Sequence, residues 1–136
     1  MRYVILVFSL LIAGSCSKPG NVTPSDTIVG TWRLTAYCKP ASSSACTAVK
    51  VPSGKSVFVA FGKDGKFNET YENTKPIEYS FLGCGSGDYT IEGNNIRIVA
   101  LCMSSTSGRL MQLVSVNNKQ LILNPFGSGE YTFERE

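Results

Sequence analysis

Few residues of this 136-residue chain have types that suggest chemistry, and histidine is absent. Without an imidazole, serine–histidine and cysteine–histidine catalysis are excluded, and the commonest transition-metal ligand is missing. Glu69, Glu72 and Glu78 could supply the paired carboxylates of a glycoside hydrolase. Nothing in the sequence brings two of them together, and solvated faces of strands account for all three. We therefore predict that the chain is not an enzyme and carries no metal and no cofactor.

Two further features have simple structural explanations. Asp64 and Asp88 fall in expected turns, where aspartate hydrogen-bonds the local backbone, and their spacing does not match a calcium loop. The glycine-rich stretch at 83–87 has the composition of a phosphate-binding loop, but such a loop needs a helix N-terminus after it. A strand is expected there instead, so the stretch is interpreted as a turn beside a disulfide.

The five cysteines divide into one near the N-terminus and four in the body of the chain. Four is an even number, which in an oxidising compartment indicates two structural disulfides. We favour Cys38 with Cys46, which closes a short loop, and Cys84 with Cys102, which flank a predicted hairpin; the other pairings stay open. No CxxC spacing and no histidine supports a redox or zinc site.

Residues 1–15 have the layout of a bacterial export signal. Arg2 gives a positive start, residues 3–12 are almost entirely apolar, and small residues follow. The apolar run is too short to span a bilayer. Residues 13–16 resemble the bacterial lipobox. That resemblance implies that Cys16 receives a lipid and becomes the first mature residue, which would hold the protein at a membrane.

The remainder of the chain divides into a tether and one domain. Residues 16–27 contain two prolines and a glycine and almost nothing apolar, which is typical of a flexible linker. Residues 28–136 are enough for one domain.

The formal net charge is only +3, with both signs mixed along the chain, so nucleic acid is not an expected partner. The predicted location is the cell envelope, at the outer membrane, on either its periplasmic face or the cell surface.

The pattern from residue 28 onward predicts an all-β domain. Short runs of β-forming residues alternate with turn residues, and no helical period is sustained. About eight or nine strands joined by tight turns favour a small up-and-down antiparallel barrel, since closure leaves no exposed edge. The expected strands are 31–37, 56–61, 67–71, 77–82, 88–92, 96–101, 110–116, 120–123 and 130–135.

Within each strand the alternation places the apolar residues on one face. The expected interior residues are Trp32, Leu34, Val57, Val59, Phe61, Phe67, Tyr89, Ile91, Ile96, Ile98, Leu121, Leu123, Tyr131 and Phe133. An eight-stranded barrel is either filled by such side chains or holds one small ligand.

Two short motifs lie near the ends of the domain. Gly30-Thr31-Trp32 opens the first expected strand, and Arg135 ends the last. Together they resemble the motifs of small lipocalin-like lipoproteins of the Bacteroidetes. In lipocalins a Gly-x-Trp motif starts the barrel, and a late basic side chain packs across the tryptophan. The resemblance implies that Trp32 plugs one end of the barrel and that Arg135 covers it through a cation–π contact.

A second resemblance competes with the first. Cys84 lies in a Gly-Cys-Gly stretch, residues 87–94 contain a Gly-x-Tyr pattern, and Cys102 follows. This order is similar to the centre of META-type domains, which are also small exported β domains. Here Gly85 stands where those domains have asparagine.

These features lead to one expected function and one alternative. The expected function is a lipid-anchored envelope lipoprotein whose lipocalin-like domain binds a small hydrophobic ligand. The alternative is a META-like interaction or scaffold module with a filled core and no ligand. A protein partner is not identified by the sequence.

Overall fold

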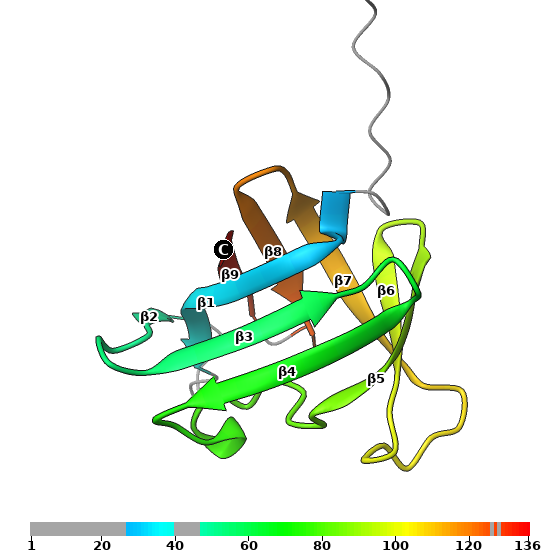
Figure 1. Cartoon of the computed structure of the whole chain (residues 1–136), viewed down its shortest axis with the longest axis horizontal. Helices are drawn as coiled ribbons and strands as arrows, with labels where there is room; N and C mark the ends of the chain where they lie inside the picture. Colours follow the sequence, from blue (N-terminus) through cyan, green and yellow to red (C-terminus); the bar gives the residue numbers. More distant parts are fainter. Residues whose placement is uncertain (1–26, 40–46, 126, 128) are drawn as a thin grey trace, which may run out of the picture.

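The computed structural model describes residues 27–39, 47–125, 127 and 129–136. Within them the chain forms nine antiparallel strands, in a single sheet that closes on itself, and one short 3-10 helix; Thr27 and Ile28, just before the first strand, are helical (Figure 1). The elements are β1 (Gly30–Lys39), β2 (Thr47–Lys50), β3 (Ser56–Phe61), β4 (Lys66–Glu72), η1 (Pro76–Glu78), β5 (Ser86–Glu92), β6 (Asn95–Val99), β7 (Arg109–Val116), β8 (Gln120–Asn124) and β9 (Tyr131–Arg135).

The sheet closes through β1, which has neighbours on both sides. Residues 30–33 of β1 pair with β3, and residues 32–37 pair with β9. β2 pairs only with the distal part of β1, so it lies outside an eight-stranded barrel made of β1 and β3–β9. From β3 onward, consecutive strands are neighbours. The predicted all-β, up-and-down antiparallel barrel is confirmed.

The antiparallel order divides the connections between two ends of the barrel. At one end lie the first described residues, the turns 62–65, 93–94 and 117–119, and the C-terminus; we call it the closed end (Figure 1). At the other end lie the connection between β4 and β5, residues 73–85, and the loop 100–108 between β6 and β7. We call this the open end, and residues 73–85 the mouth segment.

The interior is packed with large apolar side chains. Of the interior residues predicted from the alternation, all are buried except Ile91, which is partly buried. The alternation succeeds because side chains of a strand point to opposite faces in turn, and only one face of a barrel strand is shielded from water. Additional buried hydrophobic residues that the sequence interpretation did not include are Ile28, Cys38, Tyr79, Phe81, Ala100, Met111 and Leu113.

The strand predicted over 77–82 is wrong. Pro76 has no backbone N–H to give to a sheet, and η1 begins there. Ser80 adopts a left-handed conformation with φ of 50°, which ends any extended run. Tyr79 and Phe81 are nevertheless both buried, so their alternation reflects insertion into the barrel and not pairing with another strand.

Two smaller differences concern strand limits. β2 was not predicted, because its residues are all exposed and show no apolar alternation. The strand expected over 96–101 ends at Val99, and Leu101 is fully exposed in the following loop. Within the described part of the chain, no helix is long and apolar enough to cross a membrane.

Candidate binding site

The closed end of the barrel is sealed around Trp32. This side chain is completely buried, and its Nε1 donates a hydrogen bond to the carbonyl of Ile28 at 2.7 Å. The guanidinium carbon of Arg135 lies 4.1 Å from the centroid of the Trp32 ring. Arg135 also donates to the carbonyls of Val29 at 2.9 Å and Thr27 at 2.6 Å. The structure thus brings together the two residues that the Gly-x-Trp resemblance singled out, and Trp32 is shielded from water.

Glycine at position 30 follows from this contact. Gly30 has a φ of 137°, a conformation that residues with a side chain rarely adopt. A Cβ atom there would also collide with the Nη1 atom of Arg135. The glycine of the motif therefore gives the arginine room to lie across the tryptophan.

The open end is filled by rings from the mouth segment. Tyr79 and Phe81 are 2% and 6% exposed. The Phe81 ring centroid lies 5.2 Å from that of Tyr131 and 5.5 Å from that of Phe133, both on β9. The Tyr79 ring meets the ring of Tyr37 edge-on at 5.1 Å. The part of the interior nearest the open end is therefore occupied by side chains from outside the sheet.

A buried hydroxyl binds the backbone of the mouth segment. The Tyr131 side chain donates to the carbonyl of Tyr79 at 2.6 Å, and the carbonyl of Ser80 lies 3.2 Å from the same oxygen. Burial raises the pKa of Tyr131, and the nearby Tyr37 adds to the effect, so the hydroxyl stays protonated. A protonated phenol in this position is a hydrogen-bond donor to carbonyl oxygens.

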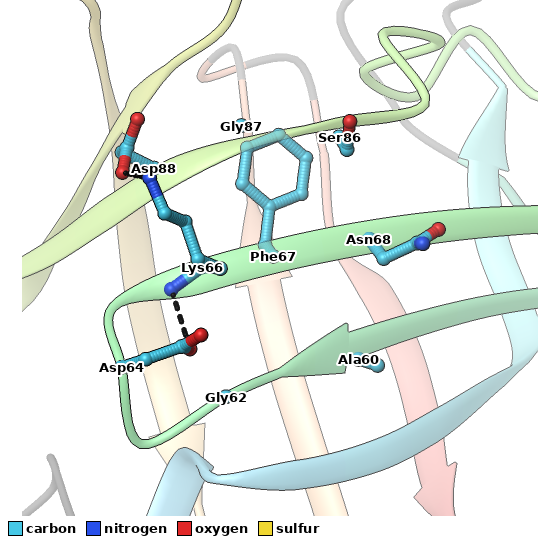
Figure 2. Close-up of a pocket in the computed structure, with 9 residues that line it drawn as sticks. All are labelled: Ala60, Gly62, Asp64, Lys66, Phe67, Asn68, Ser86, Gly87 and Asp88. Carbon is cyan, nitrogen blue, oxygen red and sulfur yellow. Dashed lines mark hydrogen bonds and ion pairs between the residues drawn. The ribbon is translucent and has the colours of Figure 1, made fainter.

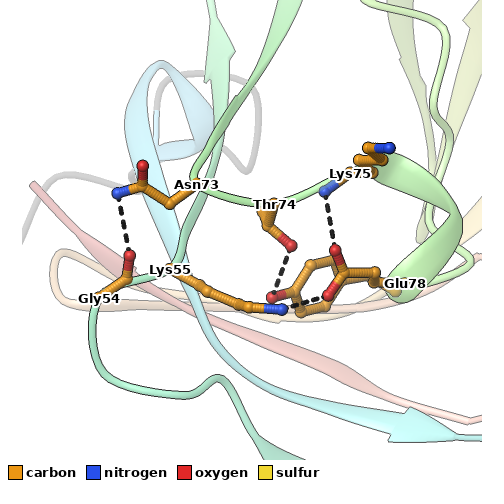
Figure 3. Close-up of polar contacts among 7 residues, drawn as sticks. Gly54, Lys55, Asn73, Thr74, Lys75 and Glu78 are labelled. Atoms are coloured by element: carbon orange, nitrogen blue, oxygen red, sulfur yellow. Dashed lines mark hydrogen bonds and ion pairs between the residues drawn. The ribbon is translucent and has the colours of Figure 1, made fainter.

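The first part of the mouth segment is held at the rim by exposed polar contacts (Figure 3). The Asn73 amide donates to the carbonyl of Gly54 at 3.1 Å, and Lys55 forms an ion pair with Glu78. Their hydrogen bond raises the pKa of Lys55 and lowers that of Glu78. Because both groups are open to water, the pair contributes little to stability.

The last part of the mouth segment is held by Glu69, the one buried charged residue in the part of the chain that the structure describes. Its carboxylate accepts hydrogen bonds from the backbone N–H groups of Gly83 at 3.4 Å, Cys84 at 2.8 Å and Gly85 at 3.3 Å. The hydroxyl of Tyr71 donates to it at 3.1 Å. The three N–H groups that the glycine-rich composition would have offered to a phosphate are thus taken by a carboxylate of the same chain.

The prediction that Glu69 lies on a solvated strand face is wrong. Phe67, Glu69 and Tyr71 alternate along β4 and share its inner face. That alternation was visible in the sequence, but an acidic residue is usually assigned to the solvated face. Glu72 lies on the opposite, exposed face of β4, and Glu78 pairs with Lys55 at the rim, so neither of these two glutamates is an acidic partner of Glu69.

Burial governs the protonation of Glu69 and Tyr71. Loss of solvation raises the pKa of Glu69, and its hydrogen bonds offset only part of that rise. Burial also raises the pKa of Tyr71, and the adjacent Glu69 carboxylate adds to it. Burying the Glu69 carboxylate therefore costs solvation free energy that its hydrogen bonds do not fully restore. Carboxyl groups with pKa values raised by burial are often found at functional sites.

A disulfide secures the same end of the mouth segment. Cys84 is bonded to Cys102 in the 100–108 loop, as the sequence predicted. Cys38 is also disulfide-bonded, and its predicted partner Cys46 lies outside the described residues. Cys16, the predicted lipidation site, and the whole of 1–15 lie outside them as well.

Comparison with known proteins agrees with this arrangement. Residues 28–123 match the sequence profile of the lipocalin-like domain family. The chain belongs to this family. A lipocalin-like protein from Bacteroides uniformis, solved by crystallography, has a similar structure, with a TM-score of 0.56 and 20% sequence identity over 81% of this chain and 99% of that one. An uncharacterised protein from Bacteroides eggerthii aligns with a TM-score of 0.43 and 17% identity over 80% and 99% of the two chains. No curated protein matches the sequence.

The outer face of this lipocalin-like barrel carries a shallow hollow of about 480 Å³ over β3, β4 and β5 (Figure 2). Its rim includes the ion pair between Lys66 and Asp88. The Asp64 carboxylate accepts a hydrogen bond from the backbone N–H of Lys66 at 3.1 Å, which is the local turn contact predicted for it. Asp88 lies in β5 and not in a turn, so its predicted local role is wrong. These contacts explain both aspartates without a ligand.

A further hollow, of about 400 Å³, lies at the rim of the open end beside the Cys84–Cys102 disulfide, with Leu82 and Met103 among its lining residues. Residues of both the mouth segment and the 100–108 loop of the lipocalin-like barrel line it. Among the described residues, no group of three or more acidic or cysteine side chains could hold a metal ion.

Proposed function

We propose that this chain is a non-enzymatic lipoprotein of the bacterial cell envelope, anchored by a lipid at Cys16, whose lipocalin-like barrel binds a small apolar ligand at its open end. The observation that carries the proposal is the way the open end is filled. Tyr79 and Phe81 occupy it, and both belong to the mouth segment and not to a barrel strand. Side chains from a connection between strands can leave without breaking the sheet.

The conformation of the mouth segment supports this exchange. Asn73 and Ser80 have φ values of 53° and 50°, which is unfavourable for residues other than glycine. Apart from η1, the segment has no regular secondary structure. Segments of this kind open at lower free energy than barrel strands do, because few backbone hydrogen bonds must break.

The rings that leave set the size of the ligand. Burying one large apolar side chain contributes about 1.5–3 kcal/mol, so the ligand must replace up to about twice this amount. A molecule with one or two rings would do so at the positions of Tyr79 and Phe81. Because the rings fill the open end at rest, only the open molecules can bind. The apparent affinity is therefore the affinity of the open form multiplied by the fraction of molecules that are open.

A second candidate function, an interaction or scaffold module without a ligand, is favoured by two exposed side chains at the open end. Ile77 in η1 is 81% exposed and Leu101 in the 100–108 loop is fully exposed. At an interface with a protein partner these two side chains would be removed from water, which favours association. In this alternative the filled core is permanent, and the loops of the open end contact a protein partner.

Vacating the open end is expected to increase ligand binding. The variant Phe81→Ala removes one of the two rings and should bind 2-(dimethylamino)naphthalene about tenfold more tightly than the wild type does, because less of the chain must move. The measurement is fluorescence titration of the mature chain carrying Cys16→Ser, so that neither lipid nor detergent competes.

The matched control is Phe67→Ala, which removes an equally buried phenylalanine from β4, on the closed-end side of the barrel. It should lose stability to a similar degree without gaining affinity for the probe. If Phe81→Ala is too unstable, Phe81→Leu opens a smaller space at the same place. Absence of probe binding to the wild type and to every Phe81 variant would rule out the ligand site and leave the scaffold function.

The lipid anchor is expected to depend on Cys16 alone. Cys16→Ser should abolish incorporation of a palmitate analogue and release the protein from the membrane fraction, because this thiol is the proposed acceptor of the lipid. Cells expressing the two forms are compared by metabolic labelling and fractionation. The variant Ser17→Ala next to it is the control and should behave as wild type. Membrane attachment that survives Cys16→Ser would contradict the anchor.

A further inference from the structure

The mouth segment shows what the open end accepts. It presents two aromatic rings, those of Tyr79 and Phe81, and two backbone carbonyls, those of Tyr79 and Ser80. We propose that the open end selects neutral aromatic ligands that carry a carbonyl oxygen, and that the Tyr131 hydroxyl binds this oxygen. The inference rests on the proposed function, since it names the class of ligand for the same site.

The hydroxyl of Tyr131 disfavours plain hydrocarbons. In the resting barrel it is buried and donates to the carbonyl of Tyr79 at 2.6 Å. When the mouth segment leaves, this donor loses its acceptor. A buried donor without a partner is unfavourable, so a ligand that returns an acceptor is bound in preference to one that does not. A carbonyl oxygen at the position of the Tyr79 carbonyl would do this.

The surrounding rings favour an aromatic ligand over an aliphatic one. The Phe81 ring contacts those of both Tyr131 and Phe133, with centroid distances of 5.2 and 5.5 Å. Tyr37 contacts both Tyr79 and Tyr131, at 5.1 and 6.0 Å. These separations are those of interacting aromatic pairs, and a planar ligand in the place of Phe81 would keep them.

The charges around the open end favour a neutral ligand. No lysine or arginine is buried among the described residues, so the carboxylate of a fatty acid would find no cation inside. The nearest buried charge is Glu69, whose carboxylate is already bound by Tyr71 and by the N–H groups of 83–85. Its negative charge would repel an anionic ligand. It also needs no cationic ligand, because its hydrogen bonds are already formed within the chain.

The last part of the mouth segment does not need to move for such a ligand to enter. Glu69 and the Cys84–Cys102 disulfide hold residues 83–85 against β4 and the 100–108 loop. The rings lie before these fixed residues, and the contacts of the first part of the segment at the rim are exposed. Opening is therefore a movement of residues 74–82 about a fixed end.

The test compares two probes that differ by a propionyl group, which carries the carbonyl oxygen. Prodan, a naphthyl ketone, and 2-(dimethylamino)naphthalene, which lacks the ketone, are titrated against the mature Cys16→Ser chain. We expect the wild type to prefer prodan, and Tyr131→Phe to reduce this preference about tenfold. The ratio of the two affinities is used because loss of the hydroxyl also loosens the mouth segment, which affects both probes alike. Laurate, an anionic chain, should not displace prodan.

Tyr89→Phe is the matched control. The Tyr89 hydroxyl donates to the carbonyl of Gly62 at 2.7 Å, near the closed end, so the same atom is removed from the same type of bond far from the ligand. Its probe preference should equal that of the wild type. Bound prodan also reports the bond directly, since its emission shifts to shorter wavelength when the donor to its carbonyl is lost in Tyr131→Phe.

The outcomes separate the two proposals. Equal preference for prodan in the wild type and in Tyr131→Phe, with no emission shift, would overturn the role of Tyr131 and leave a less selective apolar site. Binding of neither probe to the wild type or to Phe81→Ala would overturn the proposed function itself. Displacement of prodan by laurate would overturn the preference for neutral ligands.

Discussion

Glu69→Ala is expected to lower the free energy of unfolding by about 2–3 kcal/mol. The substitution removes the acceptor of three backbone N–H groups and of the Tyr71 hydroxyl. Relief of the desolvation of the carboxylate offsets part of the loss, and water can reach Gly83 and Gly85, which are exposed. Urea unfolding measures the change, and hydrogen exchange should show faster exchange at the amides of 83–85.

Glu69→Gln separates hydrogen bonding from charge. Glutamine keeps one acceptor oxygen, so the loss should be about half that of alanine or less. It also removes a pH dependence. Because burial raises the pKa of Glu69 above its ordinary value of 4.5, the folded chain holds this proton more tightly than the unfolded chain. Stability from this group is therefore greatest at low pH and falls as pH rises through the raised pKa.

The comparison of wild type and Glu69→Gln isolates that slope. Glu78 and Glu92 have lowered pKa values, caused by hydrogen bonds with Lys55 and Arg97, and they give the opposite slope in both proteins. Their contribution cancels in the difference. A difference in stability that does not change with pH above 4.5 would show that folding does not raise the pKa of Glu69. An alanine variant as stable as the wild type would show that its hydrogen bonds do not hold the mouth segment.

The fold was predictable because its determinants are local. Each strand of the barrel buries one face, so alternation along residues such as Ile96 and Ile98 on β6 reports both the strand and its inner side. Tight turns between them, such as 62–65, specify which strands become neighbours. Trp32 and Arg135 lie 103 positions apart in the sequence, and only a resemblance to a known family could connect them before the barrel was seen.

The open end was less predictable because its determinants are long-range. The alternation of Tyr79 and Phe81 is the same whether the segment forms a strand or inserts two rings into the barrel. The rings that they contact, on β1 and β9, are distant in the sequence. Glu69 was misassigned for a related reason. Its burial depends on three N–H groups from residues 83–85, and no residue pattern in β4 indicates that these groups lie nearby.

The largest loss of stability is expected at the closed end. Trp32→Ala should lower the free energy of unfolding by about 4 kcal/mol, because a completely buried indole leaves a cavity and its hydrogen bond to Ile28 is lost. Urea unfolding followed by circular dichroism is the measurement, since the substitution removes the tryptophan fluorescence. If this variant does not fold, Trp32→Phe, which keeps a ring but not the N–H, should lose about 1–2 kcal/mol.

A double-mutant cycle between Trp32→Phe and Arg135→Met tests what the arginine contributes through the ring. A cation over an indole face interacts more strongly than one over a benzene ring, so a coupling of up to about 1 kcal/mol is expected. Arg135→Met alone also loses the bonds to the carbonyls of Thr27 and Val29, which appear in both legs of the cycle and cancel. Zero coupling would mean that the indole adds nothing beyond a benzene ring, so that Arg135 holds the closed end mainly through the carbonyls of Thr27, Val29 and Asn118. Gly30 would then be required because it leaves space for the guanidinium to reach these carbonyls, and the contact of the guanidinium with the indole would be incidental.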